Sequence, residues 1–256
     1  MAELLVLGSA AGYPCPRTGH ASYLLTAGGH QVLVDAGEPC SRTLAEHNLY
    51  PSTLDAVFIT HGHADHTGGL PMLLQTAIIL ERDKPLTLVL PEELIEPLRH
   101  WLEATYAGPS VSTFPMQFVA WEQQPVFEGF GLTVTPKPTR HLEYLRKKST
   151  LPLHAFSLRI TVEQGVDLVF SGDLGGPEDL DSQLTQPVEL LVCELAHFEP
   201  ERLLEYLAQK PRINRLVLTH MAERLAGRGS ELVARARDLL PHTLTLVAED
   251  GLRLGL

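Results

Sequence analysis

Three histidines and one aspartate in a single short loop could together bind metal ions. His61, His63, Asp65 and His66 follow the apolar run Ala56–Ile59, which is typical of a buried strand. In an extended segment, side chains two positions apart point the same way, so His61 and His63 can offer two imidazoles to one cation. Asp65 and His66 come after the chain turns and can reach a second cation. The alternative is a polar loop that is His-rich by coincidence, but the fixed spacing favours a metal site.

Three further side chains of metal-binding type stand where other predicted strands end. They are His141, Asp173 and His220. Strand ends are where α/β proteins usually hold their functional residues. A carboxylate has two oxygens, so Asp173 can bridge two cations about 3.5–4 Å apart. The ordinary alternatives are a surface or core histidine at His141 and a helix N-cap at Asp173.

Three other features near these positions bear on the chemistry, and two of them allow more than one interpretation. Glu194 and His197 lie three residues apart at the end of a strand, where both are placed as proton carriers. Asp35 can accept a hydrogen bond from a metal-binding histidine, or it can simply form a turn. The basic segment Arg146, Lys147 and Lys148 follows His141, and it is either a loop that meets an anionic substrate or a solvated turn, with the turn slightly favoured.

The elements that must position these residues alternate along the chain in two halves. Hydrophobic periodicity predicts strands at 3–7, 22–26, 31–35, 56–59, 86–90, 118–120, 132–134, 156–162, 167–170, 189–193, 215–220 and 243–247, and helices at 41–47, 70–74, 91–107, 200–209 and 230–239. This order indicates two sheets sandwiched between layers of helices. No linker or repeat divides the chain, so we predict one domain over residues 1–256.

Composition fits a cytoplasmic domain without a membrane segment. The chain has 256 residues, 44% of them hydrophobic, which is enough to bury a substantial core. Leu4–Leu7 is too short for a secretory or membrane segment, and three widely spaced cysteines fit a reducing cytoplasm. A formal net charge of −11 argues against a general nucleic-acid-binding surface. It does not exclude a small anionic substrate, because bound divalent ions reverse the local field.

With these residues in this order, the chain resembles the metallo-β-lactamase superfamily over nearly its whole length. The signature is a His-x-His-x-Asp-His motif followed by a lone His, an Asp and a last His, here His61, His63, Asp65, His66, His141, Asp173 and His220. The resemblance implies a four-layer αββα sandwich with two divalent ions. It places one ion on His61, His63, His141 and Asp173, and the other on Asp65, His66, Asp173 and His220.

Within the superfamily, the chain resembles the phosphodiesterase and RNase branch. Asp65 and His66 are retained together with His220, and no Cys stands at the bridging position as it does in the true lactamases. The turns Leu7–Gly12 and Val34–Glu38 are similar to those of RNase Z, the tRNA 3′-processing endonuclease, and of the phosphodiesterase that accompanies carbon–phosphorus lyase.

Two departures separate the chain from both relatives. RNase Z generally carries a long basic arm between the lone His and the bridging Asp, whereas only 31 residues separate His141 from Asp173. The carbon–phosphorus-lyase phosphodiesterase has a structural zinc on clustered N-terminal cysteines, whereas Cys15 stands alone. Glu194 and His197 keep the spacing of an acid and a His in that phosphodiesterase, and Glu194 also falls where RNase Z has its motif Glu.

The resulting hypothesis is a metal-dependent phosphodiesterase for a small or cyclic phosphodiester. Two divalent ions, Zn²⁺ or Mn²⁺ with Fe²⁺ as a further candidate, would lower the pKa of a bridging water and give hydroxide at neutral pH. Asp65 is predicted to act in catalysis as well as in metal binding. His197 would protonate the leaving alkoxide, with Glu194 orienting it or relaying the proton.

Three alternatives stay open at this point. The nearest is a tRNA 3′-processing endonuclease, against which the short interval and the acidic charge count. A lactonase or thioesterase uses the same metals on a carboxylic ester, and a non-catalytic member would bind metal or ligand without hydrolysis. The sequence indicates a small anionic substrate and no membrane partner, and it leaves the choice between a monomer and a homodimer open.

Overall fold

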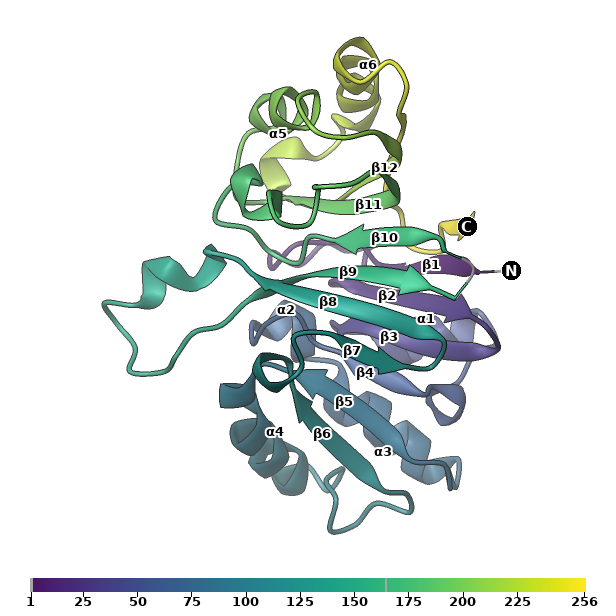
Figure 1. The fold of residues 1–256 in the computed structure, drawn as a ribbon. Coiled ribbons are helices and arrows are strands. Elements are labelled where there is room, and N and C mark those ends of the chain that lie inside the picture. The colour runs from purple at the N-terminus through teal and green to yellow at the C-terminus, as the bar shows by residue number, and fades with distance from the viewer. Residues whose placement is uncertain (1, 164) are drawn as a thin grey trace.

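The computed structural model describes residues 2–163 and 165–256, which form two β-sheets packed face to face (Figure 1). In spatial order the first sheet contains β14 (Arg253–Gly255), β1 (Glu3–Gly8), β2 (Ser22–Ala27), β3 (His30–Ala36), β4 (Ala56–Phe58), β5 (Leu86–Leu90) and β6 (Met116–Ala120). The second contains β13 (Leu244–Val247), β12 (Ile213–Met221), β11 (Val188–Leu195), β10 (Asp167–Phe170), β9 (Phe156–Val162), β8 (Leu132–Pro138) and β7 (Phe127–Gly129).

Helices cover the outer face of each sheet. Those on the first sheet are α1 (Cys40–Glu46), α2 (Ala64–Thr67), α3 (Leu70–Ile79) and α4 (Glu92–Ala104), and those on the second are α5 (Pro200–Leu207) and α6 (Gly229–Leu239) (Figure 1). The order of layers is therefore helix, sheet, sheet, helix, which confirms the predicted αββα sandwich. No helix in residues 2–163 and 165–256 is both long and apolar enough to cross a bilayer.

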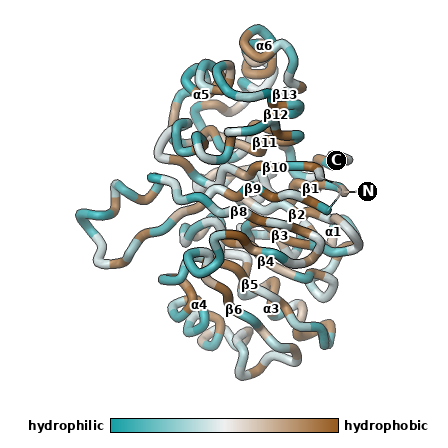
Figure 2. Tube along the Cα trace, in the orientation of Figure 1, coloured by the Kyte–Doolittle hydropathy of each residue, from teal (hydrophilic) through white to brown (hydrophobic). Residues whose placement is uncertain are grey.

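The alternation of side chains along each strand accounts for this layering. In β1, Leu4 and Val6 face the core between the sheets, whereas Leu5 and Leu7 pack under the helices of the first sheet. Both faces of the strand are buried, which explains why it reads as a continuous apolar run. In Figure 2 the hydrophobic residues, coloured brown, are likewise concentrated along the strands.

The strand ends that carry the predicted site meet at one edge of the sandwich. β10, β11 and β12 run parallel, and β8 runs in the same direction because both β8 and β10 pair antiparallel with β9. Their carboxyl ends therefore lie together. The loop that leaves β4 reaches the same edge, where the Thr60 carbonyl accepts a 3.0 Å hydrogen bond from the Phe156 amide of the other sheet.

The predicted strand at 132–134 is too short. β8 continues to Pro138, and Pro136 and Pro138 pair with Leu158 and Phe156 of β9. Prolines argue against a strand in the sequence because they have no backbone N–H to donate to a neighbouring strand. Here they are tolerated because β7 pairs only with residues 132–134, so the proline-containing part of β8 is an edge.

Candidate metal centre

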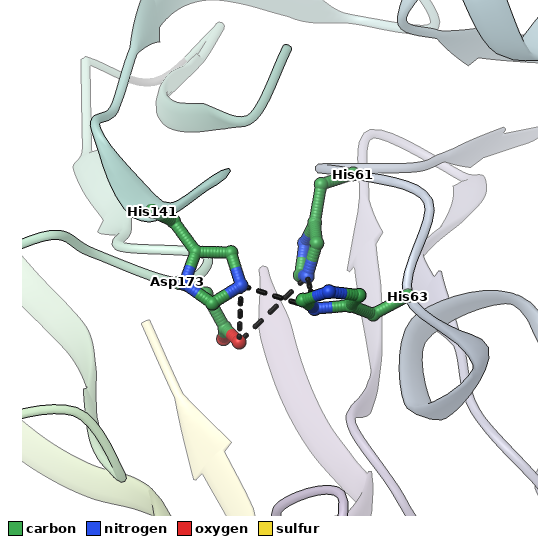
Figure 3. Close-up of side chains that lie close together, drawn as sticks. All are labelled: His61, His63, His141 and Asp173. Atoms are coloured by element: carbon green, nitrogen blue, oxygen red, sulfur yellow. Dashed lines mark hydrogen bonds and ion pairs between the residues drawn. The ribbon is translucent and has the colours of Figure 1, made fainter. Parts of the chain in front are cut away.

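Four side chains converge at the edge between the sheets to form the first donor set. It consists of His61 and His63 from the loop after β4, His141 after β8 and Asp173 after β10, with one donor atom from each within 4.8 Å of the others (Figure 3). Nδ1 of His63 lies 3.0 Å from Nε2 of His61 and 3.0 Å from Nε2 of His141. The nitrogens thus face a common point.

Asp65, His66 and His220 form the second donor set beside it. Nε2 of His220 lies 3.0 Å from Oδ2 of Asp65 and 3.2 Å from Nε2 of His66. Asp65 and His66 lie on α2, and His220 ends β12 in left-handed backbone with φ 48°. Such a conformation is costly for a residue with a side chain and is found mainly where function requires it.

Asp173 lies between the two sets and turns one oxygen toward each. Its Oδ2 is 3.7 Å from Nε2 of His61 and 3.5 Å from Nε2 of His141, whereas its Oδ1 is 3.4 Å from Nε2 of His66. Gly172 makes this placement feasible, because it has φ 53° and a Cβ there would lie 2.5 Å from the Phe156 carbonyl oxygen. Asp173 does not cap a helix, since the 3₁₀ turn that follows begins after Gly176.

The chemistry of the donors fits two cations. Imidazole nitrogens that face one another at 3.0–3.2 Å cannot all donate hydrogen bonds, so a cation is the partner that satisfies them together. Oδ1 of Asp173 and Nδ1 of His220 are buried and have no hydrogen-bond partner among the described residues. Buried polar atoms of this kind are rare in native proteins unless a ligand or ion completes them.

Burial and charge set the protonation of the donors in a way that suits a cation. Burial lowers the pKa of His61 well below its usual value and that of His141 to about 4, so both are neutral at pH 7. Burial alone would raise the pKa of Asp65, but the hydrogen bond with His220 and the charge of His66 lower it to about 2. Neutral imidazoles and ionised carboxylates are the forms that bind metals.

His66 behaves differently when no cation is bound. Burial alone would lower its pKa, but the carboxylates of Asp173 and Asp35 raise it well above the usual value. Its Nε2 must lose a proton before it can bind a cation. We therefore expect cation affinity at the second donor set to fall as the pH is lowered.

One buried carboxylate orients a histidine of each donor set. Asp35 accepts a 2.8 Å hydrogen bond from Nδ1 of His66, and it also accepts the Thr60 hydroxyl at 2.9 Å. The Thr60 oxygen in turn lies 3.1 Å from Nδ1 of His61 and can accept its proton. The sequence allowed two interpretations of Asp35, and the structure supports the one in which Asp35 orients histidines. Its contacts direct Nε2 of both rings toward the donor sets.

Replacing Asp35 with asparagine should weaken metal binding by roughly 10- to 100-fold, the range found when a partner of a metal-binding side chain is removed. Asn tolerates the left-handed backbone of this position, φ 56°, so the turn should persist. Competition with a chromophoric zinc chelator measures the affinity. Asp55→Asn is the matched control. Asp55 directly precedes β4, at the end of that strand away from the centre, and it accepts a hydrogen bond from the Gln31 amide. Equal affinity in wild type and Asp35→Asn would contradict the orienting role.

Glu194 and His197 adjoin the first donor set. Nδ1 of His197 lies 2.8 Å from Oε1 of Glu194, and its Nε2 points to Oδ2 of Asp173 at 3.9 Å. The Glu194 carboxylate also accepts the backbone amides of Leu174, Ala196 and His197. Glu194 is therefore an anchor that fixes the His197 ring and the loop after Asp173, while His197 remains partly exposed at the site.

The basic segment is exposed, and one aromatic residue beside it contacts the centre. Side chains of Arg146, Lys147 and Lys148 are exposed in the loop that projects between β8 and β9 (Figure 1). In the described residues, the hydroxyl of Tyr144 lies 3.2 Å from Nε2 of His63. The sequence analysis did not identify this contact. The spacing could have shown only that Tyr144 shares a face with His141, because residues three apart lie on one face of a 3₁₀ turn and His141–Leu145 is such a turn. It does not identify His63 as the partner.

Comparison with known proteins places this geometry in context. A family profile described as the β-lactamase superfamily domain matches residues 30–228. A protein named ribonuclease Z from Metallosphaera sedula is 27% identical over 296 aligned positions, which cover 98% of this chain and 97% of the relative. A ribonuclease Z from Pseudomonas putida is 37% identical over 211 positions, which cover 75% of this chain and 65% of the relative.

Solved structures share the fold along the whole chain. The metallo-β-lactamase-fold protein YhfI from Bacillus subtilis has a TM-score of 0.79 at 20% identity, covering 99% of this chain and 98% of that one. The short form of human tRNase Z has a TM-score of 0.74 at 21% identity, covering 99% and 98%. A diphosphatase of the PhnP family has a TM-score of 0.71 at 20% identity, covering 100% and 98%. At these identities the likeness concerns the fold alone.

Proposed function

The chain belongs to the β-lactamase superfamily of metal-dependent hydrolases, and from that premise we propose that it hydrolyses a small or cyclic phosphodiester. The observation that carries the proposal is the position of Asp173, whose two oxygens face two separate His/Asp donor sets. The first set would hold one divalent ion, and Asp65, His66 and His220 would hold the other together with Asp173. Zn²⁺ and Mn²⁺ both suit these nitrogen and oxygen donors, and Fe²⁺ is a further candidate.

When bound, two divalent ions would lower the pKa of a water molecule and neutralise the oxygens of a phosphodiester. The protein supplies the orientation. Asp35 fixes the rings of His66 and, through Thr60, of His61, so their donor nitrogens need little rearrangement. Asp65, ionised and partly exposed, adds negative charge to the second set, where its Oδ2 lies 3.0 Å from Nε2 of His220.

His197 is proposed as the general acid that protonates the leaving alkoxide. Its Nδ1 is held by Glu194, so its Nε2 is the atom that faces the centre and would carry the transferred proton. Burial alone would lower the pKa of His197, but the hydrogen bond and the charge of Glu194 raise it above its usual value. A raised pKa increases the fraction of rings that carry a proton at any given pH, and a general acid must carry that proton.

The surroundings of the centre favour a small substrate. A groove of about 520 Å³ runs beside it between the turn after β1 and the segment after β12, and its lining includes Tyr13, Arg17 and Met221. Its volume lies in the range of small-molecule sites, roughly 300–1,000 Å³. Gly12 connects the groove to the centre, because a Cβ there would lie 3.3 Å from Oδ2 of Asp65. The ring of Tyr13 can pack against the organic group of a phosphodiester, and the guanidinium of Arg17 can pair with its negative charge.

A tRNA 3′-processing endonuclease is the second candidate, and the full-length match to a ribonuclease Z favours it. Two observations count against it. The alignment runs over 296 positions whereas this chain has 256 residues, so the relative has segments that this chain lacks. The formal charge of −11 also leaves little basic surface for a folded RNA, apart from Arg146, Lys147 and Lys148.

A direct assay separates these functions. Metal-analysed protein is given bis(p-nitrophenyl) phosphate, a 2′,3′-cyclic nucleotide and a precursor tRNA, each with added Zn²⁺ or Mn²⁺. We expect metal-dependent turnover of the first two substrates and its loss in Asp65→Ala. Efficient endonucleolytic cleavage of the tRNA would instead support the second candidate. Two bound metals without phosphodiesterase activity would contradict both and favour a carboxylic ester such as a lactone or thioester.

A further inference from the structure

The projecting loop between β8 and β9 is anchored at both ends but hardly in its middle. At one end, the amide and Nε of Arg140 donate to Asp179 at 2.9 and 2.6 Å. At the other, the amide of His154 donates to Glu93 on α4, and Nδ1 of His154 lies 2.7 Å from Oε1 of Glu122. The two anchors belong to opposite sides of the sandwich, so the loop spans the edge where the metal centre lies.

Past His141, which belongs to the first donor set, one polar contact joins residues 143–152 to the rest of the described chain. It runs from the hydroxyl of Tyr144 to Nε2 of His63, over 3.2 Å. The other polar contacts of residues 143–152 stay within the loop, such as the ion pair between Arg146 and Glu143 at 4.0 Å. The Tyr144 side chain is 60% exposed, so little apolar burial supplements this hydrogen bond.

We propose that Tyr144 is a positioning residue that couples docking of the basic loop to metal occupancy of the first donor set. His63 uses Nδ1 to face the donor set, which leaves Nε2 as the outer nitrogen. A cation on Nδ1 requires Nε2 to carry the proton, and it polarises the ring so that this N–H becomes a stronger donor to the Tyr144 oxygen. The loop is then held over the centre.

Linkage makes the effect reciprocal. If cation binding strengthens the hydrogen bond between His63 and Tyr144, the hydrogen bond must strengthen cation binding by the same factor. Since one exposed hydrogen bond is involved, we expect a factor of about three to ten. The consequence for function is that Arg146, Lys147 and Lys148 are held at the entrance for a larger fraction of the time when the centre is loaded, which adds positive charge where an anionic substrate enters.

The loop itself provides the measurement, because Arg146, Lys147 and Lys148 are adjacent trypsin sites. Cleavage in this loop is followed by mass spectrometry on full-length protein, with saturating Zn²⁺ and after chelation. In wild type, Zn²⁺ should slow cleavage at these three sites by about three- to tenfold. In Tyr144→Phe this protection should disappear, and Zn²⁺ affinity measured by chelator competition should fall by the same factor. Tyr106→Phe, which alters an exposed tyrosine after α4, should behave as wild type.

The coupling rests on the proposed function in one respect only: a divalent ion must bind to the first donor set. It can therefore fail while the proposed hydrolysis stands. Loop cleavage that Zn²⁺ slows equally in wild type and Tyr144→Phe would overturn the coupling, even if both proteins hydrolyse phosphodiesters. Unchanged Zn²⁺ affinity in Tyr144→Phe would overturn it as well. A changed visible spectrum of the Co²⁺-loaded variant would support it, since the spectrum reports on the donors themselves. A protein that binds no divalent ion would refute the metal centre and the coupling together.

Discussion

Replacing Asp173 with asparagine should remove activity almost completely, by on the order of 10³-fold or more, because several kcal/mol of transition-state stabilisation depend on the paired ions. Among residues 2–163 and 165–256, Asp173 is the one whose oxygens face both donor sets, at 3.5 and 3.4 Å from His141 and His66. An amide keeps the shape but loses the negative charge. Metal analysis after dialysis should show fewer than two ions per chain.

Asp167→Asn is the matched control for this change. Asp167 begins the same strand that Asp173 follows, and it accepts hydrogen bonds from Arg159 and Thr161 away from the centre. This variant should keep both ions and full turnover. Two tightly bound ions in Asp173→Asn would show that Asp173 does not bridge them.

Replacing His197 with alanine should lower turnover by about 10²–10⁴-fold while both ions stay bound, because a general acid contributes that much. The loss should depend on the leaving group. A p-nitrophenolate leaves without a proton, whereas an alkoxide needs one, so a methyl or nucleoside diester should lose far more activity than bis(p-nitrophenyl) phosphate. His30→Ala is a suitable control, since His30 is also partly exposed and lies 3.2 Å from a carboxylate, that of Asp55.

The pH profile gives an independent check on His197. The acid form is the active one, so turnover of an alkyl diester should fall as the pH rises through the pKa of His197, which Glu194 raises. The fall should be absent in His197→Ala. If the variant loses its metal instead, His197 is a metal ligand. An equal loss of activity on both leaving groups would contradict the role as general acid.

The fold and the positions of the donor residues could be predicted from the sequence because both leave local signals. Continuous apolar runs mark strands buried on both faces, such as β1, and His61, Asp173 and His220 each stand within three residues of the end of such a run. Parallel directions of β10, β11 and β12 then bring Asp173, Glu194 and His220 to one edge.

The orienting contacts could not be predicted in the same way, because they join residues far apart in the chain. Asp35 and His66 are 31 positions apart, and nothing in either segment decides between a turn and a hydrogen bond to a ring. Tyr144 and His63 are 81 positions apart. The left-handed backbone at His220 is likewise set by its surroundings, since its amide is held by the Ser9 carbonyl at 2.9 Å.

The donor sets lie where the two sheets meet, so cations bound there would also stabilise the folded protein. His61, His63, Asp65 and His66 are carried by the first sheet, whereas His141, Asp173 and His220 are carried by the second. Each cation would therefore act as a cross-link between the halves of the sandwich. By mass action, an ion present at 1,000 times its dissociation constant adds about 4 kcal/mol to the free energy of unfolding, against a typical total of about 5–15 kcal/mol. Scarcity of metal would then limit the lifetime of the folded protein as well as its turnover.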